Sequence, residues 1–391
     1  MRCADPAPEM AVSTMAVTRF HLLLPSLKIS GGVREALRLA NELDECADCS
    51  VDVVCMWQSQ HAVSEQRLPA TALSGWPTRV GLALIQLPVI AARFFMRVRR
   101  ESAVAGRCDR RWIFTHYATM PLSLVVPRPQ RWYFVQGLEW QFLRRVPLAS
   151  WLLKQFMLFA YRRGVVISAN AYLTEQLRLH GVPVAAEAPI WADARYAVAP
   201  AKVRDIDVVM MLRKGAPKRL DLYRLLIAAL LRQSPRIRLA VVTPEDEIAE
   251  SLQNDVDACV VRPGLTAMAA LYSRSRVFVF LSEHEGFGLP PLEAMGAGCV
   301  PICRNSGGVR SYMKGSLEAL LVPLQSDIES IAAHTLSLLA DEVRLAELSD
   351  VSRQHFQAGL ERTHGRVHAL GPLFRSQSAN SVSPGATLEA P

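Results

Sequence analysis

Short apolar runs alternate with segments of helical periodicity along most of the chain. The runs are rich in β-branched and aromatic residues, which is typical of buried strands. Apolar side chains recur at helical spacing over 32–43 and 221–231, which predicts helices there. This alternation predicts βα units and parallel sheets. The predicted strands are residues 19–24, 51–56, 112–114, 132–135, 165–168, 208–212, 238–242, 258–261, 277–281 and 300–303.

Residues 183–206 contain three prolines but no sustained periodicity, so this segment is predicted to connect two domains. The length of 391 residues supports this prediction, because one domain usually holds about 150 residues. We therefore expect an α/β protein of two doubly wound parallel-sheet domains. Its expected parts are a disordered leader (1–17), an N-terminal domain (18–190), a linker (191–206), a C-terminal domain (207–375) and a disordered tail (376–391).

The chain has a formal net charge of +8, and its basic residues cluster over 93–111. This cluster suits a phosphate-rich partner or an anionic membrane surface, while a solvated basic face is the alternative. The apolar stretch 81–96 is too short and too interrupted to cross a bilayer, which needs about 20 residues. A membrane-interface helix and a core helix with a basic last turn both stay open. The arginines that would meet lipid headgroups are Arg93, Arg97, Arg99 and Arg100.

The eight cysteines are scattered and form no dense disulfide framework. Cys46 and Cys49 make a lone CxxC with no second pair at zinc-finger spacing. Residues 1–17 lack the apolar core of a secretion signal. We therefore expect reduced thiols and a cytoplasmic location, with peripheral association at the inner face of the cell membrane following from the basic cluster.

The segment 277–295 is the most informative part of the sequence. An apolar strand runs into a glycine-bearing loop and then into a helix with prolines in its first turn. Glycines before a helix N-terminus allow backbone N–H groups to approach an anion such as a diphosphate. The loop carries Glu285 and the helix carries Glu293, and a carboxylate accepts hydrogen bonds from two hydroxyls of a sugar or ribose diol. On spacing alone, a helix-dipole acid and a solvated loop acid remain equally good interpretations.

The run from Glu285 to Glu293 resembles the E-x7-E motif of retaining glycosyltransferases of family 4. Residues 261–264, 293–298 and 300–302 and the pair Gly307-Gly308 follow that family's C-terminal domain in order, so the similarity covers about residues 205–355. The resemblance implies a GT-B fold, in which two Rossmann-like domains face each other across a cleft. A weaker similarity links residues 28–33 and 133–139 to polysaccharide rhamnosyltransferases.

The resemblance also implies roles for individual residues. Glu293 would hold the ribose of a nucleotide diphosphate sugar, and Glu285 would contact the transferred sugar. The backbone around Glu285 would face the sugar or phosphate, and the loop at 262–265 would lie near the base. The residues so assigned to donor binding are Gly286, Phe287, Gly288, Leu289, Arg262, Gly264 and Leu265.

Arg213 and Lys218 stand where the family places an Arg and a Lys on the donor diphosphate. Fixed cations stabilise the charge that develops on a leaving phosphate without a metal ion. Because no Asp-x-Asp is placed for a divalent ion, we expect metal independence and no cofactor. The family's usual glycine before the Arg is Leu212 here, Lys214 competes for the role of Lys218, and a basic turn without a ligand is the alternative.

The N-terminal half offers shorter signals. Gly31 and Gly32 stand between a strand and a helix, where family members carry a Gly-Gly near the donor, and a plain helix-entry turn is the alternative. His116 follows a strand at the position of a family histidine that touches the donor sugar, although a lone His is often structural. Gln136 and Glu139 are acceptor-side candidates, with strand-end capping as the competing interpretation.

Taken with the resemblance, the sequence predicts a retaining glycosyltransferase for cell-surface polysaccharide synthesis. Its expected partners are a nucleotide diphosphate sugar and a glycan or lipid-linked saccharide acceptor. A nucleotide-sugar epimerase of GT-B fold and a non-catalytic membrane-surface protein are the rival functions. No nucleic-acid partner is expected, because no aromatic-interleaved motif accompanies the basic cluster.

Overall fold

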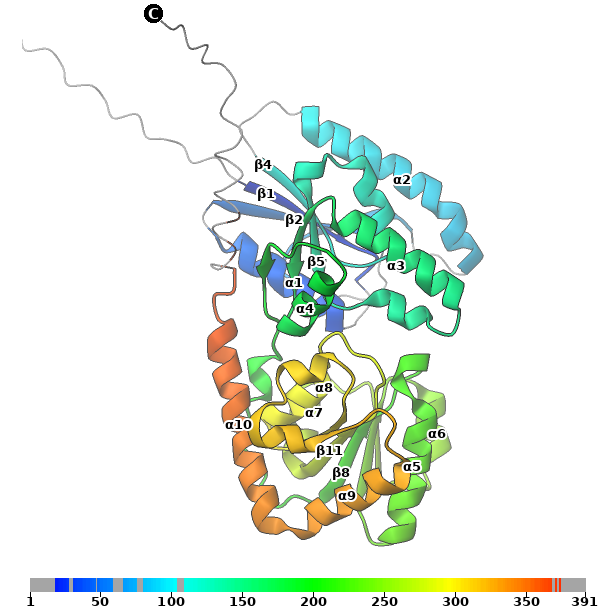
Figure 1. Ribbon diagram of the computed structural model, residues 1–391, viewed down its shortest axis with the longest axis vertical. Coiled ribbons are helices and arrows are strands. Elements are labelled where there is room, and N and C mark those ends of the chain that lie inside the picture. The colour runs from blue at the N-terminus through cyan, green and yellow to red at the C-terminus, as the bar shows by residue number, and fades with distance from the viewer. Residues whose placement is uncertain are drawn as a thin grey trace, which may run out of the picture. The chain divides into compact units, whose positions relative to one another are not determined.

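The computed structural model describes residues 18–27, 31–46, 48–58, 66–75, 80–103 and 109–367, together with Leu370 and Leu373. The expected leader and tail lie outside these residues. The described chain forms two compact units (Figure 1). Unit 1 holds residues up to Phe114, Pro121–Trp132 and Leu373, and unit 2 holds Thr115–Met120 and the residues from Tyr133 to Leu370.

The first sheet is seven-stranded, in the order β3-β2-β1-β4-β5-β6-β7. In this sheet β1 pairs in parallel with β2 and β4, and β6 pairs in parallel with β7. Its strands are β1 (Thr18–Leu24), β2 (Cys49–Trp57), β3 (Ala70–Ser74), β4 (Asp109–Phe114), β5 (Arg131–Val135), β6 (Val165–Ser168) and β7 (Ala186–Glu187). The helices of this part are α1 (Gly31–Asp44), α2 (Val80–Ala103), α3 (Pro147–Tyr161) and α4 (Ala171–Leu179).

The second sheet lies wholly in unit 2 and is parallel, in the order β10-β9-β8-β11-β12-β13. The strand order reverses between β8 and β11, and ligands of open α/β sheets bind at the carboxyl ends of strands beside such a switch point. The strands are β8 (Ile206–Met211), β9 (Leu239–Thr243), β10 (Ala258–Val261), β11 (Ser275–Phe280), β12 (Val300–Arg304) and β13 (Leu321–Val322). The helices are α5 (Leu220–Gln233), α6 (Asp246–Leu252), α7 (Leu265–Arg274), α8 (Leu289–Gly296), α9 (Ile328–Ala340) and α10 (Glu342–Thr363).

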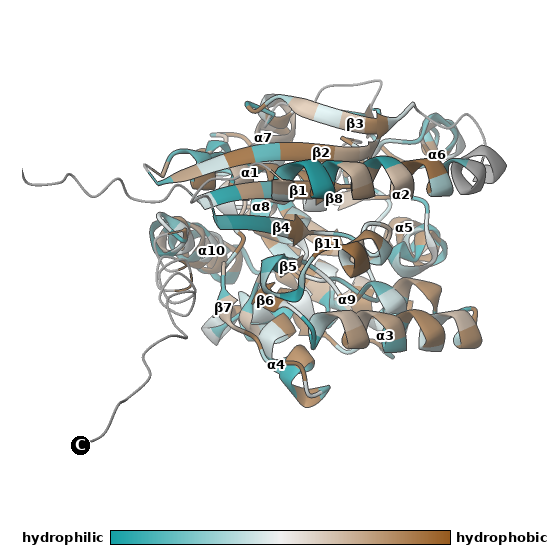
Figure 2. Ribbon diagram, turned by 90° about the horizontal axis from the view of Figure 1, so that it is seen from above, coloured by the Kyte–Doolittle hydropathy of each residue, from teal (hydrophilic) through white to brown (hydrophobic). Residues whose placement is uncertain are grey.

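The apolar pattern explains where the elements form. The residues of β9 are buried throughout, as expected of a central strand covered on both faces. In α3, apolar residues occur around much of the helix circumference, and Figure 2 shows this helix largely in brown.

All ten predicted strands and both predicted helices are confirmed, with small differences at their ends. The largest difference is in β4, which begins at Asp109 rather than at the predicted residue 112. Its first three residues are charged, so the apolar pattern did not indicate them. Arg111 is nevertheless fully buried, since its guanidinium binds Asp109 and lies 4.6 Å from the ring centroid of Trp132.

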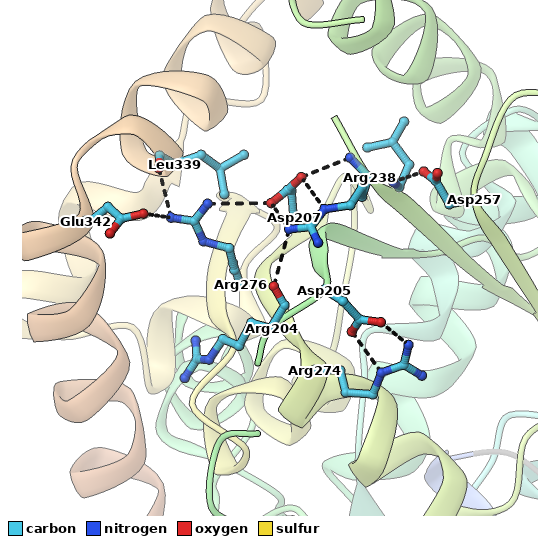
Figure 3. A network of polar contacts seen from close by, with 10 residues as sticks. Arg204, Asp205, Asp207, Arg238, Asp257, Arg274, Arg276, Leu339 and Glu342 are labelled. Carbon is cyan, nitrogen blue, oxygen red and sulfur yellow. Dashed lines mark hydrogen bonds and ion pairs between the residues drawn. The ribbon is translucent and has the colours of Figure 1, made fainter. Parts of the chain in front are cut away.

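An ion network covers the amino ends of the central strands of the second sheet (Figure 3). Asp207, at the start of β8, accepts hydrogen bonds from the backbone N–H and guanidinium of Arg238 and lies 3.5 Å from the guanidinium of Arg276. Beside it, the more exposed Asp205 binds Arg274. Ion pairs therefore stabilise the amino edge of the second sheet. The loops of the candidate site follow the carboxyl ends of its strands.

Candidate functional site

Lys218 and Glu285 meet at the carboxyl edge of the second sheet. Lys218 ends the short turn after β8, and Glu285 lies in the loop after β11. Because β8 and β11 are neighbours in the sheet, the two loops are brought together, and Lys218 Nζ lies 2.6 Å from Glu285 Oε1. Both side chains are largely buried, with exposed fractions of 30% and 13%. The structure thus joins one predicted cation to one predicted acid.

The neighbouring basic residues behave differently. The ammonium of Lys214 forms an exposed ion pair with Glu247, so it is engaged away from Glu285. Arg213 is half-buried between the buried Leu212 and Lys214. Lys218 is therefore the lysine of this turn that contacts the predicted sugar-binding carboxylate.

Glu293 lies in α8 and is half-buried. Glu293 and Glu285 both influence the pKa of one buried hydroxyl, that of Tyr312. This hydroxyl donates a hydrogen bond of 2.6 Å to the carbonyl oxygen of Gly288. Burial raises the pKa of Tyr312 well above its ordinary value, and the charges of Cys303, Glu285 and Glu293 raise it further. The two predicted glutamates therefore lie within electrostatic range of the same buried group.

The backbone of the Glu285 loop fits so closely that glycine is required. A Cβ atom on Gly286 would lie 2.0 Å from the carbonyl oxygen of Gln136, and one on Gly308 would lie 2.4 Å from the backbone nitrogen of Phe287. Gly288 precedes α8 with a φ of 84°, a left-handed conformation that favours glycine. The predicted donor-facing backbone from Gly286 to Leu289 is thus held in one conformation by contact on two sides.

Two polar contacts that the sequence analysis missed also hold this loop. Asn170 Nδ2 donates to the carbonyl oxygen of Gly286 at 2.9 Å, while its Oδ1 caps α4 by accepting from the Leu173 N–H. Arg144 Nη1 lies 2.5 Å from His284 Nε2. Since Arg has no acceptor, this ring nitrogen accepts, which requires neutral His284, and burial followed by the charge of Arg144 lowers the pKa of His284. An Asn between a strand and a helix is a recognisable cap signal, whereas no local pattern marks Arg144 or His284.

His116 and Glu139 lie together beyond the carboxyl ends of β4 and β5. Glu139 Oε2 accepts from the backbone N–H of Tyr117 at 2.6 Å, and its Oε1 lies 3.7 Å from His116 Nε2. Burial raises the pKa of Glu139 to about 8 and lowers that of His116 to about 4. At neutral pH the imidazole is therefore uncharged, and most of the Glu139 carboxyl groups carry a proton.

The amide oxygen of Gln136 is buried and has no hydrogen-bond partner among the described residues. Its backbone carbonyl is the group that excludes any side chain at Gly286. Gln136 therefore adjoins the Glu285 loop and still has an unused acceptor.

The residues predicted near the base form the entry to α7. Arg262 has a φ of 49°, and its guanidinium binds the carbonyl of Pro244 and the carboxylate of Asp246, each at 2.7 Å. Gly264 is the residue before α7 and Leu265 is its first residue. The guanidinium of Arg262 is thus engaged within its own loop.

The remaining predicted residues lie in unit 1. Gly31 and Gly32 are exposed and begin α1, and the preceding residues 28–30 lie outside the described part. In α2, Arg93 donates to the carbonyl of Leu73 at 2.5 Å, and Arg97 lies 3.9 Å from Asp52. Arg99 and Arg100 are exposed near the C-terminal end of α2. The guanidinium of Arg99 lies 5.7 Å from the ring centroid of Phe95. Across the described ranges, none of the helices is both long and apolar enough to span a bilayer.

One group among the described residues has the spacing of metal ligands, namely His21, Asp52 and Glu101 in unit 1. Burial and the charges of Arg97, Arg19 and Arg110 lower the pKa of His21 to about 3. Arg19 also lies 3.1 Å from the Asp52 carboxylate. Three arginines thus supply positive charge beside this group. We therefore interpret it as an ion network rather than as a cation site.

Comparison with known proteins agrees with the topology. Residues 199–355 match the family model described as glycosyl transferases group 1. Sucrose-phosphate synthase from Thermosynechococcus elongatus superposes with a TM-score of 0.73 at 17% identity, covering 93% of this chain and 100% of that chain. This likeness, with two parallel-sheet α/β domains, confirms the predicted GT-B fold.

Two curated relatives match shorter segments. O-antigen chain mannosyltransferase B of Escherichia coli is 43% identical over 72 residues, which are 18% of this chain and 18% of that protein. GDP-mannose:cellobiosyl-diphosphopolyprenol alpha-mannosyltransferase of Xanthomonas campestris is 29% identical over 169 residues, 39% of this chain and 44% of that protein. The chain thus spans less than half of the length of either relative.

Proposed function

We propose that this chain, whose residues 199–355 form a glycosyl transferases group 1 domain, moves a sugar from a nucleotide diphosphate sugar to a saccharide acceptor with retention of configuration. The observation that carries the proposal is the contact of Lys218 with Glu285 at the switch point of a GT-B sheet. A cation and a carboxylate side by side suit a ligand that has both a phosphate and hydroxyl groups. A donor that binds there would replace their mutual contact with one to each of its own groups.

The donor would lie on the domain predicted at 207–375 and the acceptor on the domain predicted at 18–190. Lys218 and Arg213 would bind the diphosphate, Glu285 the transferred sugar and Glu293 the ribose. The N–H groups of Phe287 and Gly288 precede or begin a helix, where backbone donors favour an anion. Arg262, Gly264 and Leu265 would border the base.

The reaction forms a bond from an acceptor hydroxyl oxygen to the anomeric carbon while the bond to the diphosphate oxygen breaks. The departing phosphate takes the acceptor's proton on the same face of the sugar, so configuration is retained. Lys218 and Arg213 stabilise the charge that develops on the diphosphate, which is the part a divalent metal plays elsewhere. Neutral His116 would bind a sugar hydroxyl, and Gln136 and Glu139 would bind the acceptor.

We propose mannose as the transferred sugar, GDP-mannose as the donor and a polyprenyl-diphosphate-linked saccharide as the acceptor, in cell-surface polysaccharide synthesis at the cytoplasmic face of the membrane. The support is the similarity to the two mannosyltransferase relatives, one of which uses GDP-mannose and a diphosphopolyprenol-linked saccharide. A screen of GDP-mannose against UDP-glucose, each with and without a synthetic lipid-linked saccharide, tests this choice. Acceptor-dependent transfer from GDP-mannose supports it, and transfer from UDP-glucose alone rejects mannose.

The same reactions separate the rival functions. Conversion of the donor to an isomeric nucleotide sugar without acceptor indicates an epimerase, and absence of any turnover with intact nucleotide binding indicates a non-catalytic protein. NMR of the product reports retention through the one-bond carbon–proton coupling at the anomeric centre, because the H1–H2 coupling of a mannoside is small in both configurations. An unchanged rate after chelation with EDTA supports metal independence, and a lost rate that Mg²⁺ restores rejects it.

We also propose that the basic end of α2 contacts an anionic membrane surface. The support is the exposure of Arg99 and Arg100 beside the exposed Phe95 and Met96. The double variant Arg99→Glu/Arg100→Glu should bind phosphatidylglycerol vesicles more weakly than the wild type. Equal binding of the wild type and the variant to the vesicles would show that the basic end of α2 does not contact the membrane.

A further inference from the structure

A second apolar surface, distant in sequence from α2, is exposed on unit 2. It comprises the short 3-10 turn at Glu139–Leu143, the link that follows it, and α3. Leu148, Trp151 and Leu152 are 68%, 56% and 53% exposed, which is unusual for large apolar side chains. We call this surface the α3 face; its members are Phe142, Leu143, Val146, Leu148, Trp151, Leu152 and Phe159.

The α3 face follows from helical geometry rather than from scattered exposure. Leu148, Trp151, Leu152 and Phe159 recur at intervals of three, four and seven residues, which places them on one side of the helix. Met157, Leu158, Ala160 and Tyr161 are buried and attach the other side of α3 to unit 2. The helix is therefore apolar on two sides, and one of them has no protein cover within the described chain.

The chain segment that forms this face is basic, and the one acidic residue in it is Glu139, which begins the turn. From Trp140 to Thr174 the sequence contains no Asp or Glu. Arg163 lies 3.5 Å from the ring centroid of Phe159 on the face itself, and the charges of Lys154 and Arg162 contribute to lowering the pKa of His180 after burial. The basic residues of this stretch are Arg144, Arg145, Lys154, Arg162 and Arg163.

We propose that the α3 face docks on an anionic lipid bilayer, with α3 lying along the membrane surface. Apolar side chains on one side, including a tryptophan, and arginine or lysine around them are the features that bind the headgroup region. A helix of 15 residues is about 22 Å long and lies along a bilayer rather than across it. A second copy of the chain is a poor occupant, because a two-fold contact would bring two acid-free basic stretches together.

This inference adds to the proposed membrane contact of α2 a second surface that is supported by its own observations, and its test uses no sugar. The full chain is mixed with vesicles of equal parts phosphatidylglycerol and phosphatidylcholine and floated through a density gradient. The wild type should float with these vesicles and should be released as the salt concentration approaches about 1 M, because screening removes the attraction to the headgroups. Leu148→Glu/Trp151→Glu and Arg145→Glu/Lys154→Glu should each lower the bound fraction by about tenfold.

The matched control is Leu225→Glu/Val343→Glu, which places the same charges at exposed apolar positions on α5 and α10. This variant should float like the wild type, and circular dichroism and melting temperature confirm that every variant is folded. The proposal is overturned if the Leu148/Trp151 variant floats like the control, or if pure phosphatidylcholine binds equally well. Failure of the wild type to float overturns it too, as does lipid-free self-association that the Leu148/Trp151 variant abolishes.

Discussion

Lys214 and Lys218 lie four residues apart in one basic turn and pair with different carboxylates. The partner of Lys218 is Glu285, in the loop at the switch point, whereas the partner of Lys214 is the exposed Glu247. Their different surroundings give each lysine a different expected effect on ligand binding.

Lys218→Ala should weaken the binding of GDP by at least about tenfold, since a charged hydrogen bond contributes about 1.5 to 3 kcal/mol. Lys214→Ala serves as the control and should change the affinity by less than about twofold, because its partner is exposed and screened. Isothermal titration calorimetry measures both. Equal losses in the two variants would show that the turn acts as an undivided basic patch.

Glu139 gives a second prediction at the same scale. Its ordinary pKa of 4.5 applies to the unfolded chain, while burial raises the folded value to about 8. Between these values the folded chain holds a proton that the unfolded chain releases, so this contribution to stability is present at low pH and is lost as pH rises toward 8. The wild type should therefore lose more melting temperature between pH 6 and pH 8.5 than Glu139→Gln does, by roughly 2 °C or more.

The exposed Glu175→Gln variant should follow the wild type at every pH. A wild-type pH profile that Glu139→Gln reproduces would mean that Glu139 is charged in the folded chain at neutral pH. His116 affects stability in a lower pH range. Burial lowers its pKa from 6.5 to about 4 in the folded chain, so its contribution to stability is lost as pH falls from 6.5 toward 4.

At the scale of elements, the ion network at the amino edge of the second sheet combines a half-buried pair with an exposed one. Asp207 is 14% exposed and Asp205 is 42% exposed, although both stand at the start of β8. Burial tends to raise the pKa of Asp207, but the hydrogen bonds and charges of Arg238 and Arg276 hold it below its ordinary value. The network thus stabilises the ionised Asp207.

Asp207→Ala should lower the free energy of unfolding by about 2 kcal/mol, because it removes the carboxylate that Arg238 binds and leaves Arg276 with the exposed Glu342. Asp205→Ala should cost less than about 1 kcal/mol, as expected for an exposed pair. Chemical denaturation followed by circular dichroism compares the two. If both variants lose the same amount, the network contributes no more than ordinary surface pairs.

The element scale also shows what the sequence could and could not predict. The strands β6 and β10 appear at their predicted bounds because both are continuous apolar runs, although β10 is a half-buried edge strand. The strands β3, β7 and β13 escaped prediction, since β7 and β13 have two residues each and β3 has a weak apolar pattern. In the site, Lys218 and Glu285 followed from the resemblance to a known family, whereas Arg144 and His284 are 140 residues apart and pair only through tertiary packing.

At the scale of the whole molecule, the candidate site residues lie in loops that follow the carboxyl ends of strands in both sheets. The ion network of Asp207 lies at the amino ends of the second sheet. Asn170 and Gln136 follow strands of the first sheet, and both contact Gly286 in the loop after β11 of the second. The residues proposed for acceptor and donor therefore come together through a few backbone atoms. A change of the Glu285 loop should consequently affect both substrates.

The most direct test is the initial rate of mannose transfer from GDP-mannose to a lipid-linked saccharide, measured for the wild type and Glu285→Gln. The account predicts acceptor-dependent transfer by the wild type and a value of kcat/KM at least about tenfold lower for the variant, because a hydrogen-bonding charge to the sugar is lost. Equal rates for the two proteins, or no transfer from any nucleotide sugar to any saccharide tested, would contradict it.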